Sequence, residues 1–75
     1  RGMVAEEREA DEDLGHAALV GDVAGISAAL LAGANVNALV GHIKWTPLQW
    51  AAQRGRVAAM KALLAAGAHV DGVNR

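Results

Sequence analysis

The chain has 75 residues, an apolar content of 53% and a formal net charge of −1, which together suit one small folded domain. It contains no Cys, so disulfides and thiolate zinc sites are excluded, and the composition is compatible with a reducing compartment. No apolar run approaches the roughly 18 residues that cross a membrane, and the acidic, polar N-terminus does not resemble a secretory signal. We therefore expect an intracellular protein, cytoplasmic or nuclear, with no membrane as partner.

The small net charge conceals an asymmetry along the chain. Residues 1–22 carry two basic and seven acidic side chains (net −5), whereas residues 23–75 carry five basic and one acidic (net +4). The acidic stretch is interpreted as a solvated helix face or a frayed tail, and the alternative is an arm that mimics a polyanion or docks on a basic partner. The basic side chains are dispersed and form no stripe, so nucleic acid is not expected as a partner.

Four helices are predicted, because apolar stripes at helical spacing alternate with glycines that end a helix. The first covers residues 3–20, and the second covers residues 23–32 with Asp22 as its N-cap. The third covers residues 47–54, where Thr46 caps the first turn and Pro47 occupies the first helical position. The fourth covers residues 57–66. The residues of the second helix expected to face the core are Val23, Ile26, Leu30 and Leu31.

The segment between the second and third helices is predicted to leave the helical layer. Residues 34–38 are expected to be extended, and residues 39–45 to form a loop or hairpin. This loop is unusually apolar for a projecting segment, since it contains Leu39, Val40, Ile43 and Trp45. Exposed apolar patches tend to mark contact sites, so the loop is a candidate binding surface.

The two halves of the chain repeat in register, with a period of roughly 34 residues that is typical of helical repeat proteins. The matched glycines lie where a helix is expected to stop, and the matched aliphatic residues are expected to lie on inward stripes. The pairs are Ala17 and Ala51, Ala18 and Ala52, Gly21 and Gly55, Val23 and Val57, Ile26 and Met60, Leu30 and Leu64, Gly33 and Gly67, Ala34 and Ala68, Val36 and Val70, and Asn37 and Asp71. The sequence therefore predicts two copies of one helical unit.

The second unit resembles the ankyrin repeat. The run T-P-L-Q-W-A-A-Q-R-G at residues 46–55 is similar to the T-P-L-H-x-A-A-x-x-G signature, with Gln49 in place of the usual His. Residues 63–71 are similar to the family's L-L-x-x-G-A-D-V-N tail at full length. The resemblance covers residues 12–74. It implies an all-α fold of ankyrin-type helix-turn-helix repeats, stacked as a short solenoid with a projecting hairpin or loop finger.

The resemblance divides the chain into four segments. Residues 1–13 are expected to be an acidic helical extension or cap, 14–38 a first, cap-like repeat, 39–71 a second repeat with its finger, and 72–75 the start of a further finger or a tail. Residues 12–15 read E-D-L-G where T-P-L-H is expected, which fits a terminal repeat whose outer face meets water. The finger lacks the Asp and Gly at the positions that usually shape its tip. Two repeats fall below the roughly three needed for independent stability, so we expect a fragment of a longer array or a unit supported by the N-terminal helix.

The resemblance also implies a protein-binding surface on the finger tips and on the exposed face of the first helix of each repeat. Carried over by position, this surface comprises His42, Ile43 and Trp45 in the finger, Gln53 and Arg54 in the second repeat, and Leu19 and Val20 in the first. Trp and Arg are enriched among interface hot spots. The alternative for Ile43 and Trp45 is packing against the finger of a neighbouring repeat, and Trp50 is expected to belong to the packed framework.

No catalytic, cofactor-binding or metal site is predicted. The histidines His16, His42 and His69 are widely separated in the sequence, so none has a helical ligand partner one turn away. The glycines form no phosphate-binding motif. We therefore expect a non-catalytic module that binds another protein, without a cofactor. The alternatives are purely structural internal repeats that pack on neighbouring repeats of a longer array, and a regulatory domain attached to an enzyme.

Overall fold

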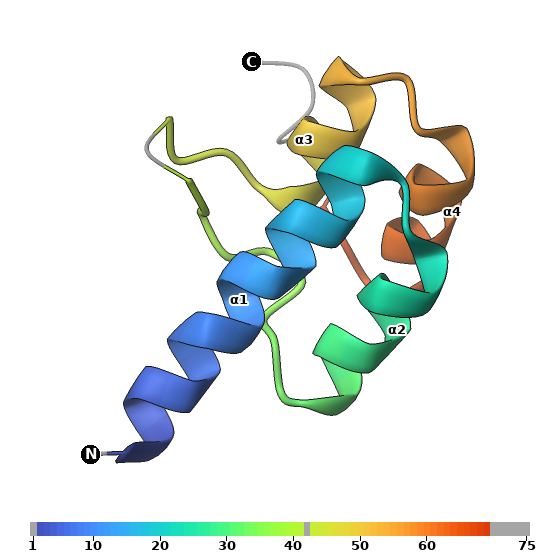
Figure 1. Cartoon of the computed structure of the whole chain (residues 1–75). Coiled ribbons are helices and arrows are strands. Elements are labelled where there is room, and N and C mark those ends of the chain that lie inside the picture. Colours follow the sequence, from blue (N-terminus) through green and yellow to red (C-terminus); the bar gives the residue numbers. More distant parts are fainter. Residues whose placement is uncertain (1, 42, 70–75) are drawn as a thin grey trace.

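The computed structural model describes residues 2–41 and 43–69, with side chains from residue 9 onward. In chain order the helices are α1 (Gly2–Val20), α2 (Val23–Leu31), α3 (Pro47–Gln53) and α4 (Val57–Ala65). The described part contains no strand, and its isolated β-bridge joins Val40 and Trp45. The fold is therefore all-α. Two helix pairs, α1 with α2 and α3 with α4, lie side by side, and the segment between α2 and α3 projects from them (Figure 1).

The helix ends follow the local sequence. Gly21 adopts a φ of 80° and turns the chain from α1 into α2, where Asp22 Oδ1 accepts a hydrogen bond from Gly25 N at 3.0 Å. The predicted helices and the Asp22 cap are confirmed. Helices α2, α3 and α4 each end one residue before the prediction, because Ala32, Arg54 and Ala66 are their C-caps.

Helix α3 has only seven residues, and a capping box fixes its start. Thr46 Oγ1 accepts a hydrogen bond from Gln49 N at 3.2 Å, and Gln49 Oε1 accepts one from Thr46 N at 2.8 Å. Pro47 is buried at the first helical position, as predicted. Gln49 therefore closes the cap at the position where the resembled family usually has His.

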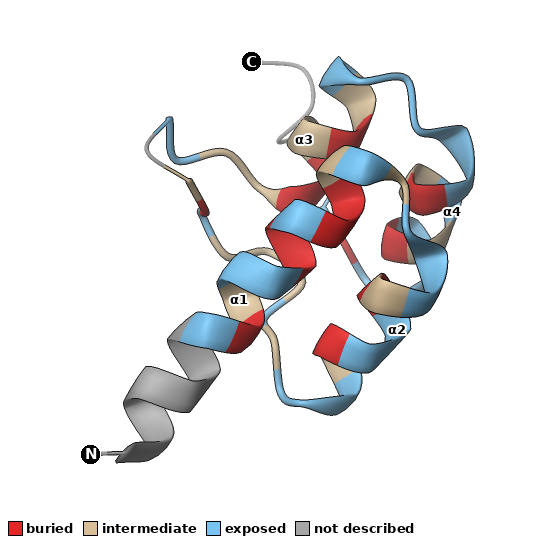
Figure 2. Cartoon of the chain, in the orientation of Figure 1, coloured by how far each residue is buried: buried red, intermediate tan, exposed pale blue. Residues whose placement is uncertain are grey.

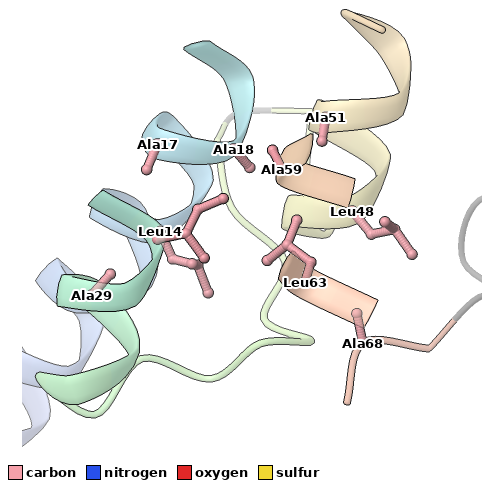
Figure 3. Packing of buried hydrophobic residues seen from close by; sticks show 10 residues of the cluster. Leu14, Ala17, Ala18, Ala29, Leu48, Ala51, Ala59, Leu63 and Ala68 are labelled. Carbon is pink, nitrogen blue, oxygen red and sulfur yellow. The ribbon is translucent and has the colours of Figure 1, made fainter. Parts of the chain in front are cut away.

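One hydrophobic core joins the two helix pairs. Its largest side chains come one from each helix, namely Leu14, Ile26, Leu48 and Leu63. Helix α1 packs on α3 and α2 packs on α4, and Figure 3 shows Leu14, Leu48 and Leu63 among the alanines of this core. The other members are alanines, which let the helices approach closely while burying little area per contact. Figure 2 shows the buried residues on the facing sides of the helices.

The inward face of α2 differs in part from the prediction. Ile26 is buried and Leu30 packs against the core, as expected, and Ala29 is buried with them. The prediction is wrong for Leu31, which is 90% exposed, and for Val23, which is exposed. Each residue advances an α-helix by about 100°, so Leu31 lies past the edge of the stripe that Ile26 and Leu30 define.

Polar contacts link segments that lie far apart in sequence. Arg56 Nε donates a hydrogen bond to Leu19 O at 3.1 Å, which ties the start of α4 to the end of α1. Asp11 Oδ1 accepts one from Asn35 N at 2.7 Å, and Asn37 Oδ1 accepts one from His69 N at 2.9 Å. The chain that follows α2 is therefore held both to α1 and to the residues after α4.

Candidate functional site

The finger, defined as residues 39–45, is a short hairpin. Val40 N donates a hydrogen bond to Trp45 O at 2.8 Å, and Trp45 N donates one to Val40 O at 3.2 Å. Lys44 N closes the turn by donating to Gly41 O at 3.1 Å. Gly41 and Lys44 have φ values of 78° and 63°. For Lys44 this left-handed conformation costs roughly 1–2 kcal/mol, so the finger pairing and its anchorage must offset that strain.

The base of the finger is fixed to the helices. Val40 is only 2% exposed and fills the space above Gly15 of α1, where an added Cβ would overlap its Cγ2 atom. Trp50 Nε1 of α3 donates a hydrogen bond to Val40 O at 3.1 Å. The rings of Trp45 and Trp50 lie with centroids 4.9 Å apart and planes tilted by 57°, an arrangement favourable for aromatic pairs. The finger is thus anchored on the first helix of each pair, α1 and α3.

The apolar residues of the finger serve two different purposes. The prediction that Val40 belongs to an exposed patch is wrong, because its side chain packs inward on Gly15. Leu39 and Ile43 are 60% and 50% exposed, and Trp45 is half-buried beside Trp50. The other finger residue predicted to bind, His42, lies outside the described residues. The exposed apolar surface of the finger therefore comes chiefly from Leu39 and Ile43.

The helix residues predicted to bind lie at the C-terminal ends of α1 and α3. Gln53 and Arg54 are exposed where α3 ends. Leu19 is half-buried, whereas Val20 is exposed. Val20 lines a shallow groove of about 250 Å³ at the turns that contain Gly21 and Gly55, and no finger residue lines this groove. Leu19 and Val20 therefore face different grooves.

A second groove lies between α1 and the finger, and we refer to it as the finger groove. It has a volume of about 200 Å³. Its lining residues come from α1, the finger base and α3, and they are Glu12, Gly15, His16, Leu19, Val40, Gly41 and Trp50. Gly41 leaves room for the ring of Trp50, since a Cβ there would lie 2.8 Å from Trp50 Cζ2. Leu19 is the residue that this groove shares with the predicted binding surface.

Glu12, His16, Gly41 and Trp50 line the finger groove but were not predicted as binding residues. A signal for part of this set is present in the sequence. Glu12, His16 and Leu19 follow the i, i+4, i+7 spacing of one helix face, and His16 and Trp50 occupy equivalent positions in the two repeats. These residues line one groove because Val40 of the finger packs on Gly15 of α1. No local sequence pattern predicts that contact.

The groove offers binding chemistry of two kinds. Leu19, Val40 and the indole of Trp50 present apolar surface, and Glu12 adds an exposed carboxylate. Among the described side chains, which begin at residue 9, no three His, Asp or Glu lie close enough together to hold a metal ion in residues 2–41 and 43–69. Over the same ranges, no helix is both long and apolar enough to span a bilayer. With its apolar surface and the carboxylate of Glu12, the lining of the finger groove suits an apolar or cationic group of another molecule.

A known protein family matches the part of the chain that contains the second helix pair. The family model of the ankyrin repeat matches residues 44–75, which begin in the finger and include α3 and α4. No curated protein and no solved structure matches the chain significantly. The match confirms the resemblance seen in residues 46–55 and 63–71.

Proposed function

Because the ankyrin repeat model matches residues 44–75, we propose that this chain is a non-catalytic module that binds another protein through its finger and first-helix face. Repeat scaffolds of this kind present extended surfaces for protein contacts. The observation that carries the proposal is the anchored finger: Val40 and Trp50 fix its base, and Ile43 projects from it half-exposed. A surface that is already ordered loses less conformational entropy when it binds.

The proposed contact surface has a finger part and a helix part. His42, Ile43 and Trp45 form the finger part, and Leu19, Val20, Gln53 and Arg54 form the helix part. Exposed Ile43 and Arg54 support this assignment, since neither side chain is needed in the core. Val20 lies toward the α1–α2 turn and would contact only a partner that extends around that end.

The test selects short random peptides displayed on phage against the folded chain. Selected peptides should bind about tenfold more weakly to Ile43→Asp and to Arg54→Ala, because interface centres concentrate the binding energy. Leu31→Asp is the matched control, since Leu31 is an exposed apolar residue outside the proposed surface. Isothermal titration calorimetry measures the affinities. Equal affinities for all three variants would contradict the proposed surface.

We further propose that residues 1–13 act as a cap for the first repeat, residues 14–38. Helix α1 runs without interruption from this segment into the repeat. Ala10 is buried, and the carboxylate of Asp11 binds the backbone of Asn35 after α2. These contacts support a cap that covers and fixes the end of the first helix pair. In this proposal residues 39–71 are the second repeat with its finger, and residues 72–75 are the start of a further finger or a tail.

A further inference from the structure

We propose that the finger groove receives an arginine side chain of the bound protein. This inference deepens the function proposed above and rests on it, because Leu19 of the groove belongs to the same surface. Three properties of the groove carry it: a volume suited to one long side chain, a wall formed by the Trp50 indole, and a carboxylate supplied by Glu12.

The size of the groove favours a side chain over a free small molecule. Its volume of about 200 Å³ is below the roughly 300–1,000 Å³ of typical small-molecule sites. Val40 and the backbone of Gly15 and Gly41 close one side. A single unbranched stem can therefore enter and pack its methylene groups against Leu19 and Val40.

The indole of Trp50 is held in place for such a contact. Its Nε1–H is already bonded to Val40 O at 3.1 Å, and Trp45 lies against the same ring system. The ring is half-buried and still lines the groove. A guanidinium plane can stack on an indole face and gain both dispersion and cation–π attraction.

The charges around the groove favour a cation. Glu12 is the carboxylate in its lining, and Glu9 and Asp13 are also exposed on α1. Residues 1–22 carry a net charge of −5. His16 also lines the groove, and Lys44 is exposed in the finger turn without lining it. The acidic face of α1 therefore attracts a basic segment, and Glu12 supplies the local anion.

Arginine fits this combination better than lysine. Its planar guanidinium can bond a carboxylate through two parallel N–H groups while it stacks on an aromatic ring. A compact ammonium group makes only a point contact and loses more hydration. Because Glu12 is exposed, the affinity of one isolated arginine is expected to lie in the millimolar range.

The test is an NMR titration of the folded chain with N-acetyl-arginine methylamide. The neutral control is the citrulline analogue, which has nearly the same shape. We expect saturable shifts at the Trp50 indole N–H and at the amides of Glu12 and Gly41. The citrulline compound should bind about fivefold more weakly. Equal affinity for the two compounds, or no saturable shift at the groove, would overturn the arginine assignment.

Two variants locate the cation. Glu12→Gln should reduce the preference for arginine over citrulline to the part that cation–π stacking on Trp50 supplies, whereas Asp13→Asn should keep it in full, because Asp13 lines a different groove beside α2. Loss of preference in both variants would point to general charge attraction and contradict the assignment. If arginine fails to bind while Ile43→Asp still weakens the selected peptides, only the arginine assignment falls. If arginine binds while Ile43→Asp has no effect, the proposed protein-binding surface falls instead.

Discussion

Gly15 and Val40 form the contact on which the position of the finger depends. They lie far apart in the sequence, yet Val40 occupies the place that a side chain at position 15 would take. Val40 is β-branched, and both its backbone N–H and its C=O are bonded to Trp45, so it has little freedom to move aside. A glycine inside α1 weakens the helix locally, and here it makes room for the finger.

Gly15→Ala should lower the free energy of unfolding by up to about 2 kcal/mol. Alanine gains up to about 1 kcal/mol of helix propensity, but overpacking against Val40 costs about 1–3 kcal/mol. Urea unfolding followed by circular dichroism at 222 nm measures the change. The sharper comparison is made in a Val40→Ala background, where the overlap with Cγ2 is gone and only the 3.2 Å approach to the Cβ of residue 40 remains, so Gly15→Ala should be clearly less destabilising there. Destabilisation of equal size in both backgrounds would show that the contact with Val40 is not the cause.

At the scale of the element, the stability of α3 depends strongly on its N-terminal cap. A helix of seven residues is too short to form from propensity alone. Its capping box satisfies backbone donors at its N-terminus, and its buried residues Pro47, Leu48 and Ala51 hold it on the core. The cap also sets the direction in which the chain leaves the finger, since Trp45 directly precedes Thr46.

Thr46→Ala should reduce the free energy of unfolding by about 1 kcal/mol, the usual cost of losing an N-cap side chain. Thr46→Ser is the matched control, because it keeps the accepting oxygen and should stay within a few tenths of a kcal/mol of the wild type. Thermal and urea unfolding of the three proteins provide the comparison. A serine variant as unstable as the alanine variant would assign the effect to the lost methyl group instead of the cap.

The helices could be predicted from sequence because their signals are local. Caps at Asp22 and Thr46, and glycines just past the helix ends, lie within a few residues of the structure they determine. The conformation of the finger was harder to predict from the sequence. Its turn places Lys44 in the left-handed region, which a residue of this type rarely adopts, and its base is fixed by Gly15. Both features depend on contacts across the fold, so the sequence pattern predicted an apolar loop without predicting which residue turns inward.

At the scale of the whole molecule, the two helix pairs share a single core. Leu14 and Ile26 from the first pair meet Leu48 and Leu63 from the second. The helix pairs are further joined by the bond from Arg56 to Leu19 O. We therefore expect neither pair to keep its structure when the other unfolds.

Leu14→Ala should destabilise the chain by about 2–5 kcal/mol through lost burial and the cavity left behind. If the core is shared, hydrogen exchange should become faster in both helix pairs of this variant. The free energy of opening should fall by the same amount for the amides of α4 as for the amides of α1. Native-state hydrogen exchange by NMR gives both values. Leu31→Ala is the control, since its exposed side chain lies outside the core. Faster exchange in α1 alone would show that the pairs open independently.

The proposed binding surface follows from the sequence only in outline. Family resemblance identified the finger and the ends of the first helices, and the structure places Ile43, Gln53 and Arg54 in exposed positions there. The family resemblance could not predict that Leu19 and Val20 line different grooves. Adjacent residues on a helix point about 100° apart, and their surroundings decide which groove each one lines. The finger groove itself is assembled from three segments, and it exists only once Val40 has docked on Gly15.

The contact between Trp45 and Trp50 gives the molecule an intrinsic optical probe at one location. The chain has no Tyr and no Phe, so its near-ultraviolet fluorescence originates in these two neighbouring indoles. One of them lines the finger groove and the other forms the finger base. A molecule that enters the groove changes the environment of the emitting rings directly. Emission intensity and wavelength therefore report occupancy of this site without a label, while contacts on the outer faces of α2 and α4 leave the signal largely unchanged.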